Sequence, residues 1–222
     1  MSDTDSFIDE VTEEVRRDRL FLMLKRYGWI GVVAVFAIVG GAAFKEYRDS
    51  QERAAAQAAG DALSAALTEN EAAARAEGLA QVNPETAGAQ AVVALARAGA
   101  LVEAGNAAEA ATVLDQLSLN MDVPQVYRDI AAFKSVLVQG DLLAADERRS
   151  RLEALAAPGA SLQFLAAEQL ALLDLSEGKT AEALTRLKEI AASEGVSRDL
   201  QERVSQVIVA LGGDQDAAAQ DG

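Results

Sequence analysis

The sequence contains no cysteine and no histidine, and only three prolines occur among its 222 residues. Without cysteine the chain has no disulfide, no thiol nucleophile, no thiolate metal site and no lipoprotein signal. Without histidine it lacks the commonest metal ligand and the commonest general base at neutral pH. These absences exclude a Ser-His-Asp triad and most zinc sites. The commonest forms of hydrolytic and metal-dependent catalysis are therefore excluded.

Positive charge is also scarce, and the formal net charge at pH 7 is −15. Residues 1–26 carry five basic and seven acidic side chains, a net charge of −2. Residues 45–222 carry fifteen basic and twenty-eight acidic side chains, a net charge of −13. A domain this acidic repels the phosphates of DNA and RNA, so we predict no nucleic-acid partner. Charge of this kind favours solubility and remains compatible with a basic protein partner.

One stretch, from Tyr27 to Phe44, has no charged side chain over eighteen residues. As a helix it rises about 27 Å, which matches the hydrocarbon core of a bilayer, and Trp29 lies near one end, where aromatic rings favour the headgroup region. A helix in the core of a water-soluble domain would carry a polar face. A cleaved signal peptide is the main alternative, because Gly41 and Ala43 resemble a cleavage site, but its apolar run is normally shorter. We therefore predict a permanent membrane-spanning helix over residues 27–44.

The orientation of this helix follows from the basic residues on either side. Five precede the apolar stretch and three follow it: Arg16, Arg17, Arg19, Lys25 and Arg26, then Lys45, Arg48 and Arg53. This bias favours a cytoplasmic N-terminus. Residues 1–26 are then expected to be a short cytoplasmic tail, and its first segment, MSDTDSFIDEVTEEV, is expected to be loosely ordered. The C-terminal bulk is expected in the periplasm of a bacterium with two membranes, which makes the chain a single-pass protein of the inner membrane.

The segment after the apolar stretch, residues 45–84, is rich in alanine and has no proline before Pro84. Alanine has the highest intrinsic helix propensity. We expect the membrane helix to continue outward as a stalk, followed by a flanking helix at 71–80 and a loop at 82–88. Residues 212–222 have the composition of a turn and a solvated segment, and we predict a disordered tail there.

The rest of the chain, residues 85–211, repeats itself. The segments GNAAEAATVLDQL at 105–117 and GKTAEALTRLKEI at 178–190 are identical at six of thirteen positions. A fainter copy has Gly140 at the corresponding place, 35 residues after the first glycine and 38 before the last. Apolar helical stretches precede and follow each glycine: 89–103, 107–118, 126–138, 142–156, 162–176 and 180–192. This period predicts an all-α solenoid of helical hairpins.

These residues resemble the tetratricopeptide repeat, which has a small residue in its first helix, a glycine turn, and then alanine and a large apolar residue in its second helix. The first and third copies match at Ala98, Gly105, Ala110 and Leu114, and at Ala171, Gly178, Ala183 and Leu187. The middle copy departs from the pattern, because Phe133 stands at the small position and Arg149 where an apolar residue is expected. The usual tryptophan and closing proline are missing, so the resemblance implies degenerate tetratricopeptide-like repeats.

The whole layout resembles one family: single-pass, periplasm-facing tetratricopeptide-like proteins that are ancillary subunits of the Sec translocon. The shared features are a charged tail, the apolar run KRYGWIGVVAVFAIVGG, the exit AFKEYR, an alanine-rich stalk and then the repeats. The resemblance implies a binding scaffold beside the translocon that cooperates with periplasmic chaperones in protein export and folding. It brings no catalytic residue. A structural envelope protein that organises cell division or cell-wall synthesis is the alternative.

Repeat solenoids usually bind protein on the face built from the first helix of each hairpin. By repeat position, six residues are candidates for partner contact: Glu103, Tyr127, Lys134, Leu137, Glu168 and Leu172. Among them Tyr127 is a plausible anchor if it is exposed. The other possibility is that flanking helices fill this groove and that Tyr127 is ordinary packing.

The sequence offers little chemistry beyond these contacts. The tripeptide GKT at 178–180 resembles the end of a phosphate-binding loop, but position 173 is leucine where that loop needs glycine. Acidic residues such as Asp146, Glu147 and Glu168 are better explained as solvated surface than as an acid-base pair or a cation site. We therefore predict a protein that is not an enzyme, with no cofactor, no metal and no small-molecule substrate.

Overall fold

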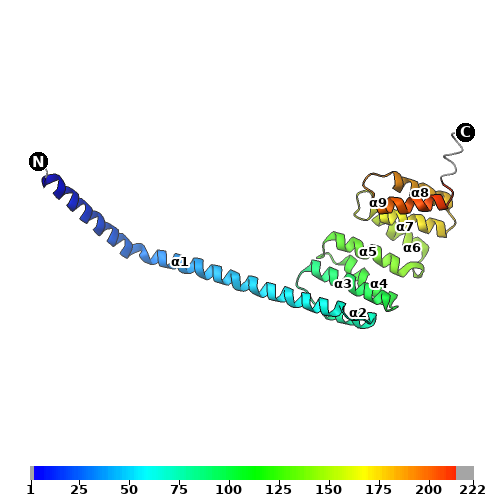
Figure 1. Ribbon diagram of the computed structural model, residues 1–222, viewed down its shortest axis with the longest axis horizontal. Coiled ribbons are helices and arrows are strands. Elements are labelled where there is room, and N and C mark those ends of the chain that lie inside the picture. The colour runs from blue at the N-terminus through cyan, green and yellow to red at the C-terminus, as the bar shows by residue number, and fades with distance from the viewer. Residues whose placement is uncertain (1–2, 214–222) are drawn as a thin grey trace. The chain divides into compact units, whose positions relative to one another are not determined.

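The computed structural model describes the backbone of residues 3–213 and the side chains of residues 25–213 (Figure 1). No strand occurs in this part of the chain, which confirms the all-α prediction. The helices are α1 Asp3–Leu67, α2 Ala72–Gln81, α3 Ala87–Glu103, α4 Ala107–Leu119, α5 Gln125–Gln139, the 3-10 turn η1 Gly140–Leu142, α6 Ala145–Leu155, α7 Gln163–Ser176, α8 Thr180–Ala192 and α9 Arg198–Ala210. The chain divides into two units, Met1–Ala55 and Ala56–Gly222, and we describe each by itself.

In the first unit, helix α1 begins at Asp3. The helix therefore includes residues 3–15, where the sequence predicted a loosely ordered segment. No glycine or proline stands between Asp3 and Tyr27, so nothing in the sequence interrupts the helix. Residues 1–2 lie outside the described part.

The apolar stretch of α1 is uncovered in the first unit. None of its most apolar eighteen-residue window is buried, and Trp29, Phe36 and Ile38 are 64%, 74% and 71% exposed. Trp29 lies near the start of the apolar stretch and Tyr47 three residues beyond its end, and both side chains are 64% exposed. Large apolar side chains on every side of a helix are unfavourable in water and favourable in lipid. This is the one candidate membrane-spanning helix in the residues that the structure describes.

In the second unit, which we call unit 2, each helix from α2 onward packs against the next one in the chain. The core has two large clusters, one made by the end of α1 together with α2 to α5, and one made by α7 to α9. A small cluster of Val136, Leu152 and Leu170 joins α5, α6 and α7 between them. Alanine lets these helices approach closely, and several alanines are fully buried at 0% exposure: Ala91, Ala110, Ala131, Ala166, Ala171 and Ala183.

Two of the helix pairs are joined by the same turn. Gly105 and Gly178 have φ of 80° and 76°, in the left-handed region that favours glycine. The backbone N–H of Asn106 donates to the carbonyl of Leu101 at 2.8 Å, and that of Lys179 donates to Asp174 at 2.9 Å. These are the long hydrogen bonds of a Schellman motif. The two repeats that look alike in sequence therefore end their first helix in the same way.

The middle pair of helices, α5 and α6, differs from the other two. Gly140 has φ of 48° and opens the turn η1, so α6 starts at Ala145 rather than at 142 as expected. Phe133 packs half-buried against the small cluster. Arg149 reaches a buried carboxylate instead of an apolar core, because its Nη2 lies 2.8 Å from Oδ1 of Asp174. An ion pair thus takes the place of the apolar contact that the repeat pattern expects.

The other expected helices lie close to the observed ones, and α8 agrees at both ends. Helix α9 had no assigned range in the sequence. Its signals are Ser197, whose hydroxyl accepts from the backbone N–H of Leu200 at 3.4 Å, and the apolar side chains of Leu200, Val204 and Ile208 at helical spacing. The predicted disordered tail lies mostly at 214–222, outside the described residues.

Candidate functional site: the exposed face of α3 and α5

One side of α5 presents large apolar residues to solvent. Val126, Ile130, Lys134 and Leu137 are spaced at i, i+4, i+8 and i+11, so they share this side of the helix. Val126 and Leu137 are 47% and 45% exposed, Lys134 is exposed and Ile130 is half-buried. Within unit 2 no helix covers this side, which makes it a candidate surface for a partner.

One side of α3 has the same character. Val92, Gly99 and Glu103 are spaced at i, i+7 and i+11, and Val92 and Val102 are each 43% exposed. The apolar side ends at Glu103, whose carboxylate forms an ion pair with Arg75 of α2. This side of α3 therefore carries small, mostly apolar residues along most of its length, and an ion pair lies at its C-terminal end.

The two sides meet at Tyr127. Helices α3 and α5 are in direct contact, and a Cβ built on Gly88 would lie 4.0 Å from Cε2 of the Tyr127 ring. Gly88 is one turn before Val92, and Tyr127 is next to Val126. We define the α3/α5 face by its exposed residues Val92, Val102, Val126, Lys134 and Leu137.

On α7, the side that corresponds by repeat position to the exposed sides of α3 and α5 is partly covered by helix α9. Glu168 is only 6% exposed, and Arg203 of α9 binds both of its carboxylate oxygens, at 2.6 Å from Nε to Oε1 and 2.7 Å from Nη2 to Oε2. These hydrogen bonds raise the pKa of the Arg203 guanidinium above its ordinary value. Glu168 is therefore part of an internal ion pair, and its prediction as an open contact residue needs correction because α9 covers it.

The other predicted contact residues have different surroundings. Lys134 and Leu137 lie together on the α3/α5 face. Leu172 is 41% exposed on α7, and Glu103 is held by its ion pair at the edge of α3. Tyr127 is half-buried and packs against the first large core cluster, so it is a packing residue with one exposed edge rather than a free anchor.

Sequence reasoning missed Val92, Val102 and Val126. Repeat position did not select these valines, because they look like ordinary core residues in an alanine-rich helix. The available signal was spacing: Val126, Ile130 and Leu137 recur on one side of α5 while the buried Ala131, Ser135 and Val136 lie on the other.

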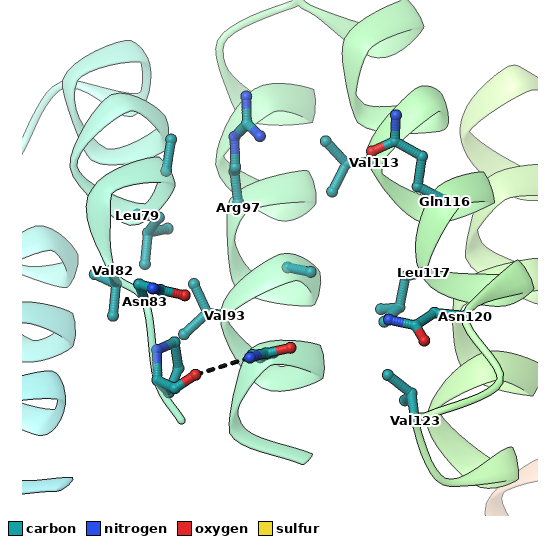
Figure 2. Close-up of a pocket in the computed structure, with 14 residues that line it drawn as sticks. Leu79, Val82, Asn83, Val93, Arg97, Val113, Gln116, Leu117, Asn120 and Val123 are labelled. Carbon is teal, nitrogen blue, oxygen red and sulfur yellow. Dashed lines mark hydrogen bonds between the residues drawn. The ribbon is translucent and has the colours of Figure 1, made fainter. Parts of the chain in front are cut away.

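A groove of about 280 Å³ lies over the other side of α3, between α2 and α4 (Figure 2). Val93 and Arg97 of α3 point into it, and Gln90 donates from Nε2 to the carbonyl of Pro84 at 2.9 Å. Arg97 is paired with Glu109, with 2.6 Å between Nη2 and Oε1. The rim carries the amides of Asn83, Gln116 and Asn120. The groove therefore offers hydrogen-bonding groups above an apolar floor, but it lacks a free acid-base group.

The buried charges of unit 2 act in its structure. Asp174 is 2% exposed and lies 2.8 Å from Nη2 of Arg149 on α6 and 3.3 Å from Nε of Arg186 on α8. Glu177 receives hydrogen bonds from Lys179 at 2.6 Å and from Arg149 at 2.8 Å, and these bonds lower the pKa of its carboxyl. The pKa of Arg149 is raised, chiefly by its hydrogen bond to Asp174. This network fixes α6, α7 and α8 to one another.

The possible chemical sites in the sequence have structural explanations. Gly178 forms the turn between α7 and α8, and Lys179 is bonded to Glu177, so GKT does not form a phosphate loop. Glu147 pairs with Arg151 one turn later at 2.6 Å. In the described residues, no group of three or more acidic side chains is arranged to hold a metal ion.

Comparison with known proteins returned no relative. No protein-family model, no curated protein and no solved structure matches this chain. The functional interpretation therefore depends on the geometry described above and on the sequence resemblance.

Proposed function

We propose that this protein is a membrane-anchored, non-enzymatic scaffold for protein partners, in which α1 crosses the bilayer once and unit 2 binds partners through the α3/α5 face. The observation that carries this proposal is the exposure of large apolar side chains on two ordered helices that already have a complete core beneath them. Such a surface is typical of interaction sites. A lysine within it and an ion pair at its edge give the polar rim that protein interfaces usually have.

We propose further that unit 2 is a degenerate tetratricopeptide-like solenoid. The residues that carry the resemblance are all deeply buried, at 2% exposure or less: Ala98, Ala110, Leu114, Ala171, Ala183 and Leu187. The shared turns at Gly105 and Gly178 also support the repeat. The departure of α5 and α6 from the pattern is compatible with a degenerate middle copy stabilised by an ion pair.

The proposed location is the inner membrane of a bacterium, with the N-terminus in the cytoplasm and unit 2 in the periplasm. Support comes from the uncovered apolar stretch of α1 and from the excess of basic residues before it. The absence of cysteine and histidine agrees with a binding role rather than a catalytic one.

The proposed pathway is protein export and folding, as an accessory to the Sec translocon and periplasmic chaperones. This specificity comes from the sequence resemblance. The acidic surplus of the C-terminal part suits partners with basic surfaces and opposes nucleic acid. No small-molecule substrate is part of the proposal.

Affinity purification of the tagged protein from gently solubilised membranes, after crosslinking in living cells, tests the pathway. Translocon subunits and periplasmic chaperones at near-stoichiometric yield are the expected result. Recovery of cell-division or wall-synthesis proteins without the translocon would support the scaffold role but contradict the proposed export pathway. A chain that co-purifies with no protein above the background of an untagged strain would contradict the scaffold itself.

A further inference from the structure

The core of unit 2 is divided at helix α6. Helix α5 contributes Ala131 to the first large cluster, and α7 contributes Ala171 to the second. The small cluster between them has three buried side chains, Val136, Leu152 and Leu170. A boundary with so few buried apolar side chains opens at a lower free energy than the packed clusters on either side of it.

Helix α6 belongs with the helices that follow it. Nη2 of Arg149 on α6 lies 2.8 Å from Oδ1 of Asp174 on α7, and Asp174 is 2% exposed. Moving α6 away from α7 would take a guanidinium partner from a buried carboxylate, which is strongly unfavourable. We therefore call residues 56–139, up to the end of α5, lobe one, and residues 145–213, from α6 onward, lobe two.

The ion pair between the two lobes is of a different kind. Nη1 of Arg151 on α6 lies 3.5 Å from Oδ1 of Asp115 on α4, and both side chains are partly exposed, at 37% and 41%. Arg151 also binds Glu147 of its own helix at 2.6 Å. Asp115 accepts a hydrogen bond from the hydroxyl of Ser135, also in lobe one, at 2.5 Å. Because each charge keeps a partner in its own lobe, this contact can break without leaving a buried, unpaired charge.

A short turn is the covalent connection between the lobes. Five residues, 140–144, join α5 to α6. Gly140, the first of them, can change φ and ψ without the steric restriction that a side chain imposes. Hinges between rigid parts of a protein are commonly a few residues at the ends of elements that absorb such changes.

We propose that lobe one and lobe two rotate against each other as rigid bodies about the boundary between α5 and α6. The ion pair between Arg151 and Asp115 holds the closed arrangement, and its loss releases the lobes. The buried ion pair of Asp174 keeps α6 with lobe two during this motion.

The consequence of the hinge for binding rests on the proposed function. Lys134 and Leu137 of the α3/α5 face belong to lobe one, and Leu172, which is 41% exposed, belongs to lobe two. Lys134 and Leu172 each stand six residues before a turn glycine, Gly140 and Gly178, so they occupy corresponding places in consecutive repeats. The hinge therefore sets the distance between the α3/α5 face and Leu172, and a surface of adjustable width accepts partners of different size.

The absence of cysteine permits a direct test with pairs of introduced cysteines. The full-length variants T112C/T185C and A73C/T112C carry nitroxide labels at exposed helix positions, and double electron–electron resonance in detergent measures the distance distribution of each pair. Thr112 and Thr185 lie in different lobes, whereas Ala73 and Thr112 both lie in lobe one. The distribution of T112C/T185C is expected to be several-fold wider than that of A73C/T112C.

Equally narrow distributions for the two pairs would overturn the hinge. That result would leave the scaffold function intact, because the measurement contains no partner. Equally wide distributions would also contradict the proposal, because lobe one would then not be a rigid body.

A second variant tests the contact that holds the lobes. Asp115→Asn removes the charge that faces Arg151 and keeps an oxygen for Ser135, so it is expected to widen the T112C/T185C distribution further. Glu109→Gln is the matched control on the same helix, because Glu109 is paired with Arg97 inside lobe one, and it should leave the distribution unchanged. Identical distributions for Asp115→Asn and Glu109→Gln would overturn the role of the ion pair between the lobes.

Discussion

Asp174 shows how individual charged residues hold unit 2 together. Its carboxylate is buried between guanidinium groups from the helices on either side, Arg149 and Arg186. Removal of one partner from a buried ion pair is strongly destabilising, because the remaining charge is left without compensation. Replacing the Asp174 carboxylate with a neutral group of the same size should therefore change the free energy of unfolding strongly.

Asp174→Asn is expected to lower the free energy of unfolding by about 2–3 kcal/mol, because two partly buried guanidinium groups lose their carboxylate. Chemical denaturation of the full-length protein in detergent, followed by circular dichroism, measures the change. Asp146→Asn replaces an exposed acid on α6 and should stay within about 0.5 kcal/mol. Equal effects of the two substitutions would mean that the Asp174 network contributes nothing.

The Glu168–Arg203 pair attaches α9 to α7. Arg203→Ala should destabilise the protein by about 1.5–3 kcal/mol, since Glu168 then stays buried without its hydrogen bonds. Arg198→Ala, on the exposed start of the same helix, is the control and should have little effect. The double variant Glu168→Gln and Arg203→Ala should be less destabilised than the sum of the single changes, and strict additivity would argue against direct coupling.

The stability that the Glu177 carboxylate contributes should be lost in acid. Hydrogen bonds from Lys179 and Arg149 lower the pKa of Glu177 in the folded state. Stability from this group is therefore complete above its unfolded pKa, about 4.3, and is lost as the pH falls through the lower folded value. The raised pKa values of Arg149 and Arg203 lie above the working range, so their contribution is constant at lower pH.

Melting temperatures between pH 7 and pH 3 test this expectation. The decrease below about pH 4.3 should be smaller in Glu177→Gln than in the wild type. Glu189→Gln, at an exposed acid of α8, should keep the wild-type profile. A Glu177→Gln profile that superimposes on the wild type would contradict the role of this carboxyl.

At the scale of elements, the turns at Gly105 and Gly178 define the helix pairs. Gly105→Ala and Gly178→Ala are each expected to lower stability by about 1–2 kcal/mol, because a side chain is disfavoured in the left-handed region. Gly99→Ala is the matched control: Gly99 is exposed within α3, nothing lies within 4 Å of a Cβ at this position, and alanine should stabilise the helix by about 0.5–1 kcal/mol. Denaturant midpoints of the three variants give the comparison.

Helix α6 is the least apolar element of unit 2, and Leu152 is its one buried residue. Leu152→Ala should remove about 2–5 kcal/mol from the junction of α5, α6 and α7. Hydrogen exchange should then show faster opening of α6 than of α4 or α8, because both large core clusters remain intact. Uniform acceleration over all helices would mean that unit 2 unfolds as one cooperative block.

The sequence contained enough to predict the helices and the two similar turns. Apolar spacing marks the helices α3, α4, α7 and α8, and glycine at positions 105 and 178 marks where the chain must turn. The ion pairs were not predictable, because no local pattern indicates that Arg203 will meet a carboxylate 35 residues away. The cover that α9 gives to Glu168 depends on packing between helices, so repeat position alone placed this residue incorrectly on an open surface.

At the scale of the whole molecule, topology is the first prediction. A periplasm-dependent reporter fused after Gly222 should be active, and a cytoplasm-dependent reporter at the same place should be silent, because the basic residues before the apolar stretch are retained in the cytoplasm. The same reporters at the N-terminus should give the opposite pattern. Activity of the cytoplasmic reporter alone after Gly222 would reverse the orientation.

The central claim is that the α3/α5 face of an anchored chain binds protein. The most direct measurement is the yield of co-purified partners from cells that express the wild type, Leu137→Asp or Leu142→Asp at equal levels. Leu137→Asp places a charge on the α3/α5 face and should reduce partner yield at least tenfold, which corresponds to about 1.4 kcal/mol of binding free energy. Leu142→Asp changes a leucine outside the face that is more exposed, at 78% against 45% for Leu137, and should retain the wild-type yield. Equal yields from all three proteins would contradict the account, because partners would then bind without this face.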